Sequence, residues 1–162
     1  MHLKNYRNKN KKDKTMKQQI LNQMKMNGYK IEETDNAIFA TRADAAPVMI
    51  KIIDGYVTFY SQYNSNLLSR SDSSGFKSYI NDLNQSCFVT RFGTNAEITT
   101  LQYDAYYMGT YDEYAFAQFI RLWEHDTRNI IDNHSESFRY LSSDEELVSE
   151  HGNESFDSYA TA

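Results

Sequence analysis

The order of helix-like and strand-like segments constrains the fold of this chain more than any motif does. A short amphipathic stretch precedes three or four segments rich in Tyr and Ile; a second amphipathic stretch, two more strand-like segments and a long aromatic helix follow. Groups of strands separated by helices are typical of α+β domains. The sequence therefore predicts one α+β domain whose antiparallel sheet has five to six strands, in the order α-β-β-β-β-α-β-β-α.

Length and charge predict a single domain between two charged extensions. The chain has 162 residues, 40% of them hydrophobic and 14% aromatic, which is enough for one core and too aromatic for a disordered chain. Residues 1–17 contain seven Lys or Arg and one Asp, whereas residues 135–162 contain one Arg and seven acidic residues. We expect a basic, flexible head at 1–14, the domain at 15–134 and an acidic, flexible tail at 135–162.

Turn and cap signals locate the first elements. Thr15 and Gln18 have the spacing of a capping box and Gly28 follows the apolar stripe, which predicts a helix over Thr15–Asn27. Asp54-Gly55 is a strong two-residue hairpin signal. The strands expected around this turn are Tyr29–Glu33, Ala37–Arg42, Val48–Ile53 and Tyr56–Tyr63, with a turn at Asp35-Asn36 and a loop at Ala43–Pro47.

Caps, turns and apolar periodicity also locate the elements in the second half of the domain. A polar stretch over Asn64–Ser74 precedes a helix whose apolar residues recur at helical spacing, with caps among Ser71 to Ser73. Thr110 and Glu113 have the spacing of a capping box for the last helix. The expected elements are a helix with Phe76, Tyr79, Ile80 and Leu83 inside, strands at Cys87–Phe92 and Glu97–Met108 around a Gly93–Asn95 turn, and a helix that buries Phe116, Phe119, Ile120, Trp123 and Ile130.

No pattern of catalytic or metal-binding residues stands out. The chain lacks a P-loop, a dinucleotide-binding glycine motif and a nucleophile elbow. Cys87 is the only cysteine, which excludes an internal disulfide or a zinc site of several cysteines, and no base lies near it in the sequence. His125, Asp132 and His134 lack the i, i+4 spacing of a helical metal site. We therefore expect no enzyme activity, metal or cofactor.

The composition also indicates where the chain resides. No apolar run approaches the length of a membrane span, and the first fifteen residues lack the apolar stretch of a secretory signal. A single cysteine fits a reducing compartment. We expect a cytoplasmic protein without membrane contact.

Large amphipathic side chains are expected on both faces of the sheet. In the strand after Asp54-Gly55, Tyr56 and Tyr60 point to one face, and Val57 and Phe59 point to the other. In the later strand, Tyr103 and Tyr107 share one face and Tyr106 lies on the opposite face. Tyr and Trp suit interfaces, whereas Tyr also pairs well across strands in ordinary packing. The candidate partner-binding residues are Tyr56, Tyr60, Tyr103, Tyr106, Tyr107 and Trp123, the last as core or anchor.

Two stretches carry a resemblance to a known fold. MKQQILNQMKMNGYKIEETDN joins a short helix to a strand at Gly-Tyr, and DEYAFAQFIRLWEHDTRNI is the closing helix. With the element order over about residues 15–132, they resemble the YbjN-like and type III secretion chaperone-like fold. The resemblance implies a small, acidic, cytosolic and often dimeric protein without a catalytic motif, and for the secretion chaperones a surface that holds an extended client segment. The Tyr content and the charged extensions depart from it.

Three functions remain open at this point. The first is a chaperone- or adaptor-like module that binds a partner protein or a second copy through its Tyr-rich sheet. The second is a phage or mobile-element protein that inhibits a host nucleic-acid-handling protein through an acidic surface that imitates phosphate. The third is an enzyme with a site built from His125, Asp104 and Cys87. Nucleic acid is not an expected ligand, because the sheet is rich in acids and only the basic head suits it.

Overall fold

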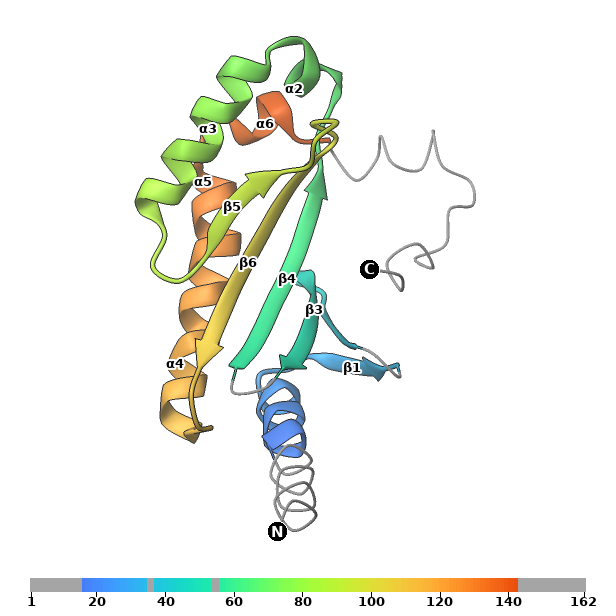
Figure 1. The fold of residues 1–162 in the computed structure, drawn as a ribbon, viewed down its shortest axis with the longest axis vertical. Helices are drawn as coiled ribbons and strands as arrows, with labels where there is room; N and C mark the ends of the chain where they lie inside the picture. Colours follow the sequence, from blue (N-terminus) through green and yellow to red (C-terminus); the bar gives the residue numbers. More distant parts are fainter. Residues whose placement is uncertain (1–15, 35–36, 54–55, 143–162) are drawn as a thin grey trace, which may run out of the picture.

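The computed structural model of this chain describes residues 16–34, 37–53 and 56–142, apart from the side chains at 129 and 130. Six strands form one antiparallel sheet in the order β1-β2-β3-β4-β6-β5 (Figure 1). Their bounds are β1 Lys30–Glu33, β2 Ile38–Arg42, β3 Ala45–Ile53, β4 Tyr56–Asn64, β5 Arg91–Thr94 and β6 Thr100–Met108. The predicted α+β class and the predicted sheet are confirmed.

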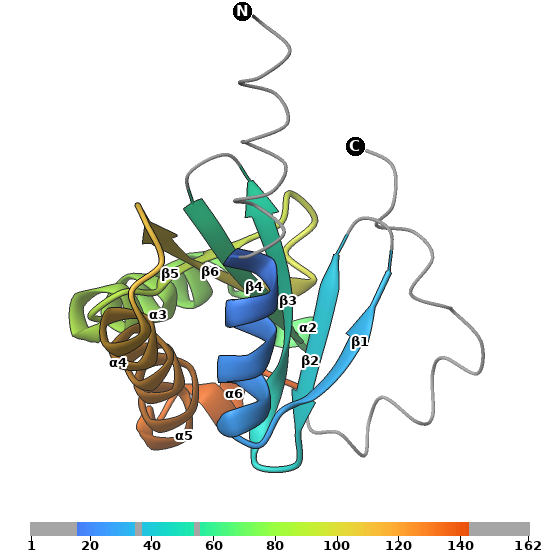
Figure 2. The ribbon, with the colours of Figure 1, turned by 90° about the horizontal axis from the view of Figure 1, so that it is seen from below.

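The helices lie on one side of this sheet, as Figure 2 shows for the N-terminal helix, α3 and α4. The N-terminal helix is described from residue 16 to residue 26. The other helices are α2 Leu67–Ser71, α3 Ser73–Ser86, α4 Glu113–Glu124, the π-helical segment η1 His125–Ile130, α5 Ile131–Asn133 and α6 Ser137–Tyr140. The fold is therefore a two-layer sandwich of helices on a sheet.

Gly28 ends the N-terminal helix in the way the sequence predicts. Its φ of 83° is left-handed, a conformation that glycine adopts without a steric cost. The N–H of Gly28 donates to the carbonyl of Lys25 at 3.0 Å, and that of Tyr29 donates to Met24 at 3.1 Å, which is the Schellman pattern. The predicted capping residue Thr15 lies outside the described residues.

The side chain of Arg42 ties the end of this helix to α4. Its guanidinium donates to Glu124 at 2.7 Å and to the carbonyl of Asn27 at 3.0 Å. The hydroxyl of Tyr29 donates to the same Glu124 carboxylate at 2.9 Å. Burial, followed by the Glu124 charge, raises the pKa of the Tyr29 phenol. The start of β1 is thus held in place from two sides.

The loop predicted at Ala43–Pro47 is present but shorter, because the turn covers residues 43 and 44 and β3 already begins at Ala45. Ala40 pairs with Val48 whereas Arg42 pairs with Ala45, so the register shifts by one residue between them. A β-bulge of this kind accommodates a proline, which cannot donate to the ladder. The hairpin residues 54 and 55, like the predicted turn at 35 and 36, lie outside the described residues.

The strand predicted at Cys87–Phe92 begins too early, since β5 begins only at Arg91 and the chain before it is irregular. The N–H groups of Phe88, Val89 and Thr90 all donate to the carboxylate of Asp126, at 2.8–3.1 Å. These donors are therefore unavailable to a neighbouring strand. The connection between these strands also lies later in the chain than the predicted turn Gly93–Asn95, because β5 continues to Thr94 and β6 begins only at Thr100.

The last helix begins at a different cap from the predicted one. Asp112 is its N-cap and accepts the N–H of Ala115 at 2.8 Å, so the predicted capping box from Thr110 is wrong. The apolar face is confirmed, because the predicted residues Phe116, Phe119, Ile120 and Trp123 are buried. The side chain of Ile130 is outside the described set.

Residues predicted to belong to a polar linker and to the tail form helices α2 and α6. Tyr140 of α6 is 1% exposed and its ring lies 5.4 Å from that of Phe76 in α3. Its hydroxyl donates to Asp72, the N-cap of α3, at 2.7 Å. The described fold therefore extends past the predicted boundary at His134, to Ser142.

Gly75→Ala is expected to destabilise the protein by about 1–2 kcal/mol, the size of overpacking effects. Helix propensity alone favours the alanine by about 1 kcal/mol. However, a Cβ at Gly75 would overlap the Tyr140 hydroxyl and the Asp72 carboxylate, which join α6 to α3. Urea unfolding gives the sign, with the exposed Ser78→Ala in the same helix as the control. A gain in stability would contradict the close contact of α6 with α3.

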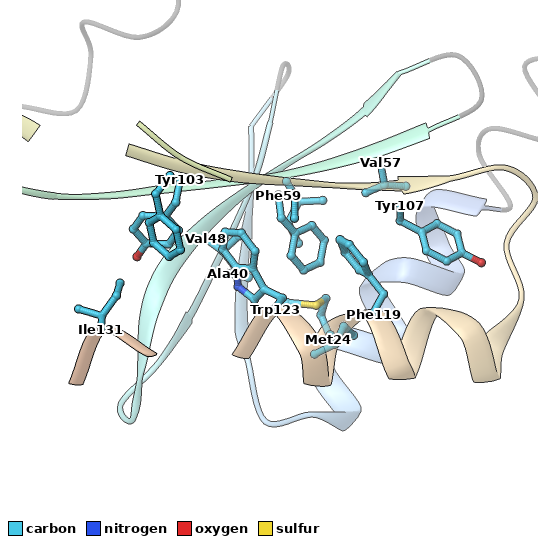
Figure 3. Packing of buried hydrophobic residues seen from close by; sticks show 14 of the residues in the cluster. Met24, Ala40, Val48, Val57, Phe59, Tyr103, Tyr107, Phe119, Trp123 and Ile131 are labelled. Atoms are coloured by element: carbon cyan, nitrogen blue, oxygen red, sulfur yellow. The ribbon is translucent and has the colours of Figure 1, made fainter. Parts of the chain in front are cut away.

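The core is built around one phenylalanine of the central strand β4. Figure 3 shows Phe59 and its neighbours pointing from the sheet toward the helices. The Phe59 ring meets those of Phe116, Phe119 and Trp123 at 6.0, 5.0 and 5.5 Å, each close to edge-on. Edge-to-face aromatic pairs contribute about 0.5–1.5 kcal/mol beyond burial. The aromatic side chains around Phe59 thus pack between one face of the sheet and the helices.

Candidate binding surface on the outer face of the sheet

The opposite face of β3, β4 and β6 carries no helix in the part of the chain that the structure describes (Figures 2 and 3). Because side chains alternate along a strand, every second residue of these strands points away from the core. We call this surface the outer face. Its residues are Met49, Lys51, Ile53, Tyr56, Thr58, Tyr60, Gln62, Gln102, Asp104, Tyr106 and Met108.

One end of the outer face is apolar and open. Ile53, Tyr56 and Met108 form one row across β3, β4 and β6, because Tyr56 pairs with both of the others. Tyr106 lies in the next row, and its ring is 6.0 Å from that of Tyr56. The exposed fractions of Ile53, Tyr106 and Met108 are 43%, 45% and 69%. We call these four residues the apolar end.

An ion pair beside the apolar end holds the neighbouring side chains in place. Arg91 donates two N–H groups to the carboxylate of Asp104, at 3.3 and 3.0 Å, and the Tyr106 hydroxyl donates to it at 2.9 Å. The guanidinium also lies 6.0 Å from the centre of the Tyr106 ring. Hydrogen bonding to Asp104 raises the pKa of both Arg91 and Tyr106. The phenol is therefore neutral at physiological pH and oriented by its acceptor.

A shallow hollow of about 170 Å³ continues the surface toward β5. Gly93 contributes no side chain to it, and a Cβ built there would meet nothing within 4 Å. The residues that line the hollow are Tyr60, Arg91, Phe92, Gly93, Thr94, Gln102, Tyr103 and Asp104. The hollow is large enough for one side chain of a partner.

The structure separates the six predicted contact residues into two groups. Tyr103, Tyr107 and Trp123 are 1%, 8% and 2% exposed, so all three belong to the core. The prediction of Tyr103 and Tyr107 as contact residues is therefore wrong, whereas Trp123 has the core position that the sequence left open beside an anchor role. Tyr56, Tyr60 and Tyr106 lie on the outer face. The structure thus brings three of the six together on one accessible surface.

The predicted contact residues did not include Ile53, Met108 or Gly93, which all contribute to this surface. Ile53 pairs with Tyr56, a register that the Asp54-Gly55 signal in the sequence already implied. Gly93 was assigned to a turn, and its place in β5 follows only from pairing with Gln102. No local signal in the sequence could have indicated the hollow.

The residues considered for chemistry do not assemble into a site. Burial raises the pKa of the Cys87 thiol to about 12, with a smaller effect of the Asp126 charge, so the thiol is protonated at neutral pH. His125 packs against the ring of Phe88 at 5.3 Å, whereas Asp104 pairs with Arg91 on the outer face. The proposed combination of His125, Asp104 and Cys87 is therefore not formed.

The described residues contain no group of three or more His, Cys, Asp or Glu placed to hold a metal ion. His134 instead packs edge-on against the Tyr79 ring at 4.9 Å. Among the helices that the structure describes, none has the length and apolar character to cross a membrane.

Comparison with known proteins identifies the fold. No family model and no curated protein matches the sequence. Among solved structures, the chain is similar to YbjN from E. coli, described as a candidate transcription regulator, with a TM-score of 0.61 and 14% sequence identity. The match covers 76% of this chain and 93% of that chain. The protein therefore has the YbjN-like fold predicted from the order of its elements, and at this identity the likeness concerns the fold alone.

Proposed function

We propose that this protein is a non-enzymatic, adaptor- or chaperone-like module that binds a partner protein on the outer face of its sheet. The observation that supports this proposal is the apolar end, where Ile53, Tyr106 and Met108 are exposed together beside Tyr56. Single exposed apolar residues are common on protein surfaces, but a contiguous group of them marks interaction sites.

The parts of the outer face have different roles in this proposal. The apolar end supplies buried area on binding, and its rings need little further ordering because the strands hold them. Arg91 and Asp104 form a polar rim, and the hollow beside Gly93 receives one side chain. A flat, preformed surface of this kind fits a folded partner or an extended segment laid across the strands.

The double variant Tyr106→Ser/Met108→Ser is expected to weaken partner binding at least about tenfold, since burial of each apolar side chain contributes of the order of 1–3 kcal/mol. Circular dichroism should be unchanged, because both side chains are exposed. The matched control is Tyr114→Ser, which removes a ring that is 75% exposed at the start of α4. Calorimetry with a partner captured by the wild-type protein measures both. Equal loss in the control, or no loss in the double variant, would refute the proposal.

Gly93→Val tests the hollow separately. The residue lies in a strand, has an ordinary φ and meets open space, so we expect the variant to fold with unchanged or slightly raised stability. The new side chain fills the floor of the hollow and should weaken binding several-fold if a partner side chain enters it. Thermal unfolding and the same binding assay provide the two readouts. Unchanged affinity would confine the binding surface to the apolar end.

The alternative of an inhibitor that imitates phosphate predicts another response to salt. Among the described residues of the outer face, Asp104 is the only carboxylate; Lys51 lies on the same face and Arg91 of β5 pairs with Asp104, so the described surface is not acidic. Affinity that persists at high salt would support apolar capture by the outer face. Affinity lost at high salt, with a nucleic-acid-handling protein as the partner, would support the inhibitor instead.

A further inference from the structure

The outward edge of β1 is open to another strand. Within the part of the chain that the structure describes, β1 pairs with β2 alone and forms one edge of the sheet. Thr34 donates its N–H to the carbonyl of Ala37 at 2.9 Å, and hydrogen-bonded pairs alternate along an antiparallel ladder. The residues of β1 that bond to β2 are therefore Lys30 and Glu32. Ile31, between them, directs its N–H and C=O away from the sheet.

We propose that two copies of this chain pair through β1, antiparallel and about a two-fold axis at Ile31. In this register each Ile31 exchanges two backbone hydrogen bonds with the partner's Ile31. Lys30 then lies directly opposite the partner's Glu32, and the symmetry creates this ion pair twice. Both side chains are exposed on the outer side of β1, so they are accessible for the contact.

The charges of β1 favour this register over its neighbour. A shift that puts Glu32 on the axis would place it opposite the partner's Glu32, and like charges directly across a strand pair are unfavourable. Charged side chains on edge strands normally oppose pairing with other sheets. The charges of Lys-Ile-Glu in β1 disfavour pairing with unrelated strands, whereas in a symmetric antiparallel pair each Lys faces a Glu of the second copy.

Pairing would also bury more of the side chain at the axis. Ile31 is only partly buried at the margin of the core, and the partner's Ile31 would cover it. Glu33 is engaged by Lys17 at 2.7 Å, on the same side of β1 as Ile31, and so does not place a free charge beside the apolar contact. The strand is short, which implies a weak, reversible dimer with a small interface.

The resulting dimer would be one continuous sheet of twelve strands. Because the axis is perpendicular to the sheet, both outer faces lie on the same side, and two copies of the apolar end are presented together. The inference does not rest on the proposed function, since β1 is at the opposite edge from β5 and the hollow. If both are correct, a partner with two binding segments gains avidity.

A disulfide trap tests the register. Residues opposite each other in a hydrogen-bonded pair have Cα atoms about 5.5 Å apart, within the range of a disulfide. Ile31→Cys should therefore form a covalent dimer under mild oxidation, seen on non-reducing gels. Glu33→Cys is the control, because residue 33 does not face itself in this register. Wild type reports any contribution of Cys87, whose raised pKa disfavours reaction. A monomeric Ile31→Cys, or equal dimer from Glu33→Cys, would overturn the inference.

Charge reversal provides a test without a new cysteine. By sedimentation equilibrium, Lys30→Glu should raise the dimer dissociation constant at least about tenfold, since two attractive pairs become repulsive. Lys30→Glu/Glu32→Lys exchanges the partners and should restore the wild-type constant. Circular dichroism monitors folding in both. A wild-type protein that stays monomeric at about 100 µM, where micromolar dimers are populated, or a double variant without rescue, would overturn the proposal.

Discussion

Asp126→Ala is expected to lower the free energy of unfolding by about 3–5 kcal/mol, the range for removal of one partner from a buried charged contact. The carboxylate is 0% exposed and accepts the N–H groups of Phe88, Val89 and Thr90. Without it, three backbone donors lose their acceptor, and each unsatisfied donor costs about 1–3 kcal/mol. Water entering the vacated space would recover part of this loss.

The measurement is urea unfolding followed by the fluorescence of Trp123, the only tryptophan, and by circular dichroism. Asp126→Asn keeps one acceptor oxygen and should lose less than the alanine variant. Asp132→Ala removes an exposed carboxylate one helical segment further on, and its effect should stay within about 0.5 kcal/mol. A loss below about 1 kcal/mol for Asp126→Ala would mean that the segment before β5 does not depend on this carboxylate.

The same contact explains why the start of β5 could not be predicted. The residues Cys-Phe-Val-Thr have strand character, and local propensity places them in a strand. The N–H groups of Phe88, Val89 and Thr90 bond instead to a side chain 36–38 residues further along the chain. By contrast, Gly28 and the Asp54-Gly55 hairpin carry their signal within a few residues, and the pairing of Ile53 with Tyr56 agrees with the hairpin.

Short elements were missed for a related reason. Helix α6 has four residues, too few for an apolar period, and it is held by contacts with α3 that the sequence does not reveal. The N-cap of α4 was displaced by two residues because Asp112 competes with Thr110 as a cap, and both are good capping residues. The type and order of the long elements were predictable, whereas these ends and additions depend on tertiary packing.

The candidate surface shows a similar division. Alternation along the strands correctly put Tyr106 on the face opposite Tyr103 and Tyr107. It could not show which face the helices cover, because both faces carry large side chains. The helices cover the face that carries Phe59 and Tyr103, because Trp123 of α4 packs against both rings. Only then does the apolar end emerge as exposed.

Phe59→Ala should cost about 3–5 kcal/mol, as large-to-small changes of buried phenylalanine do. Phe59 is 0% exposed at the centre of the sheet, and it loses its contacts with Phe119 and Trp123 when truncated. The adjacent Tyr60 lies on the same strand but on the outer face. Tyr60→Ala is therefore the matched variant, with an expected cost of about 1 kcal/mol.

Urea unfolding of the pair measures the difference between the two faces of one strand. A large gap shows that the helices bury the Phe59 face and that the Tyr60 ring contributes little to folding. In that case Tyr60→Ala should weaken partner binding while the circular dichroism stays as in wild type. Equal, large costs would mean that the outer face is itself part of a stability core. The candidate binding surface would then have to be sought elsewhere on the molecule, because a ring needed for folding is not free to be exchanged between solvent and a partner.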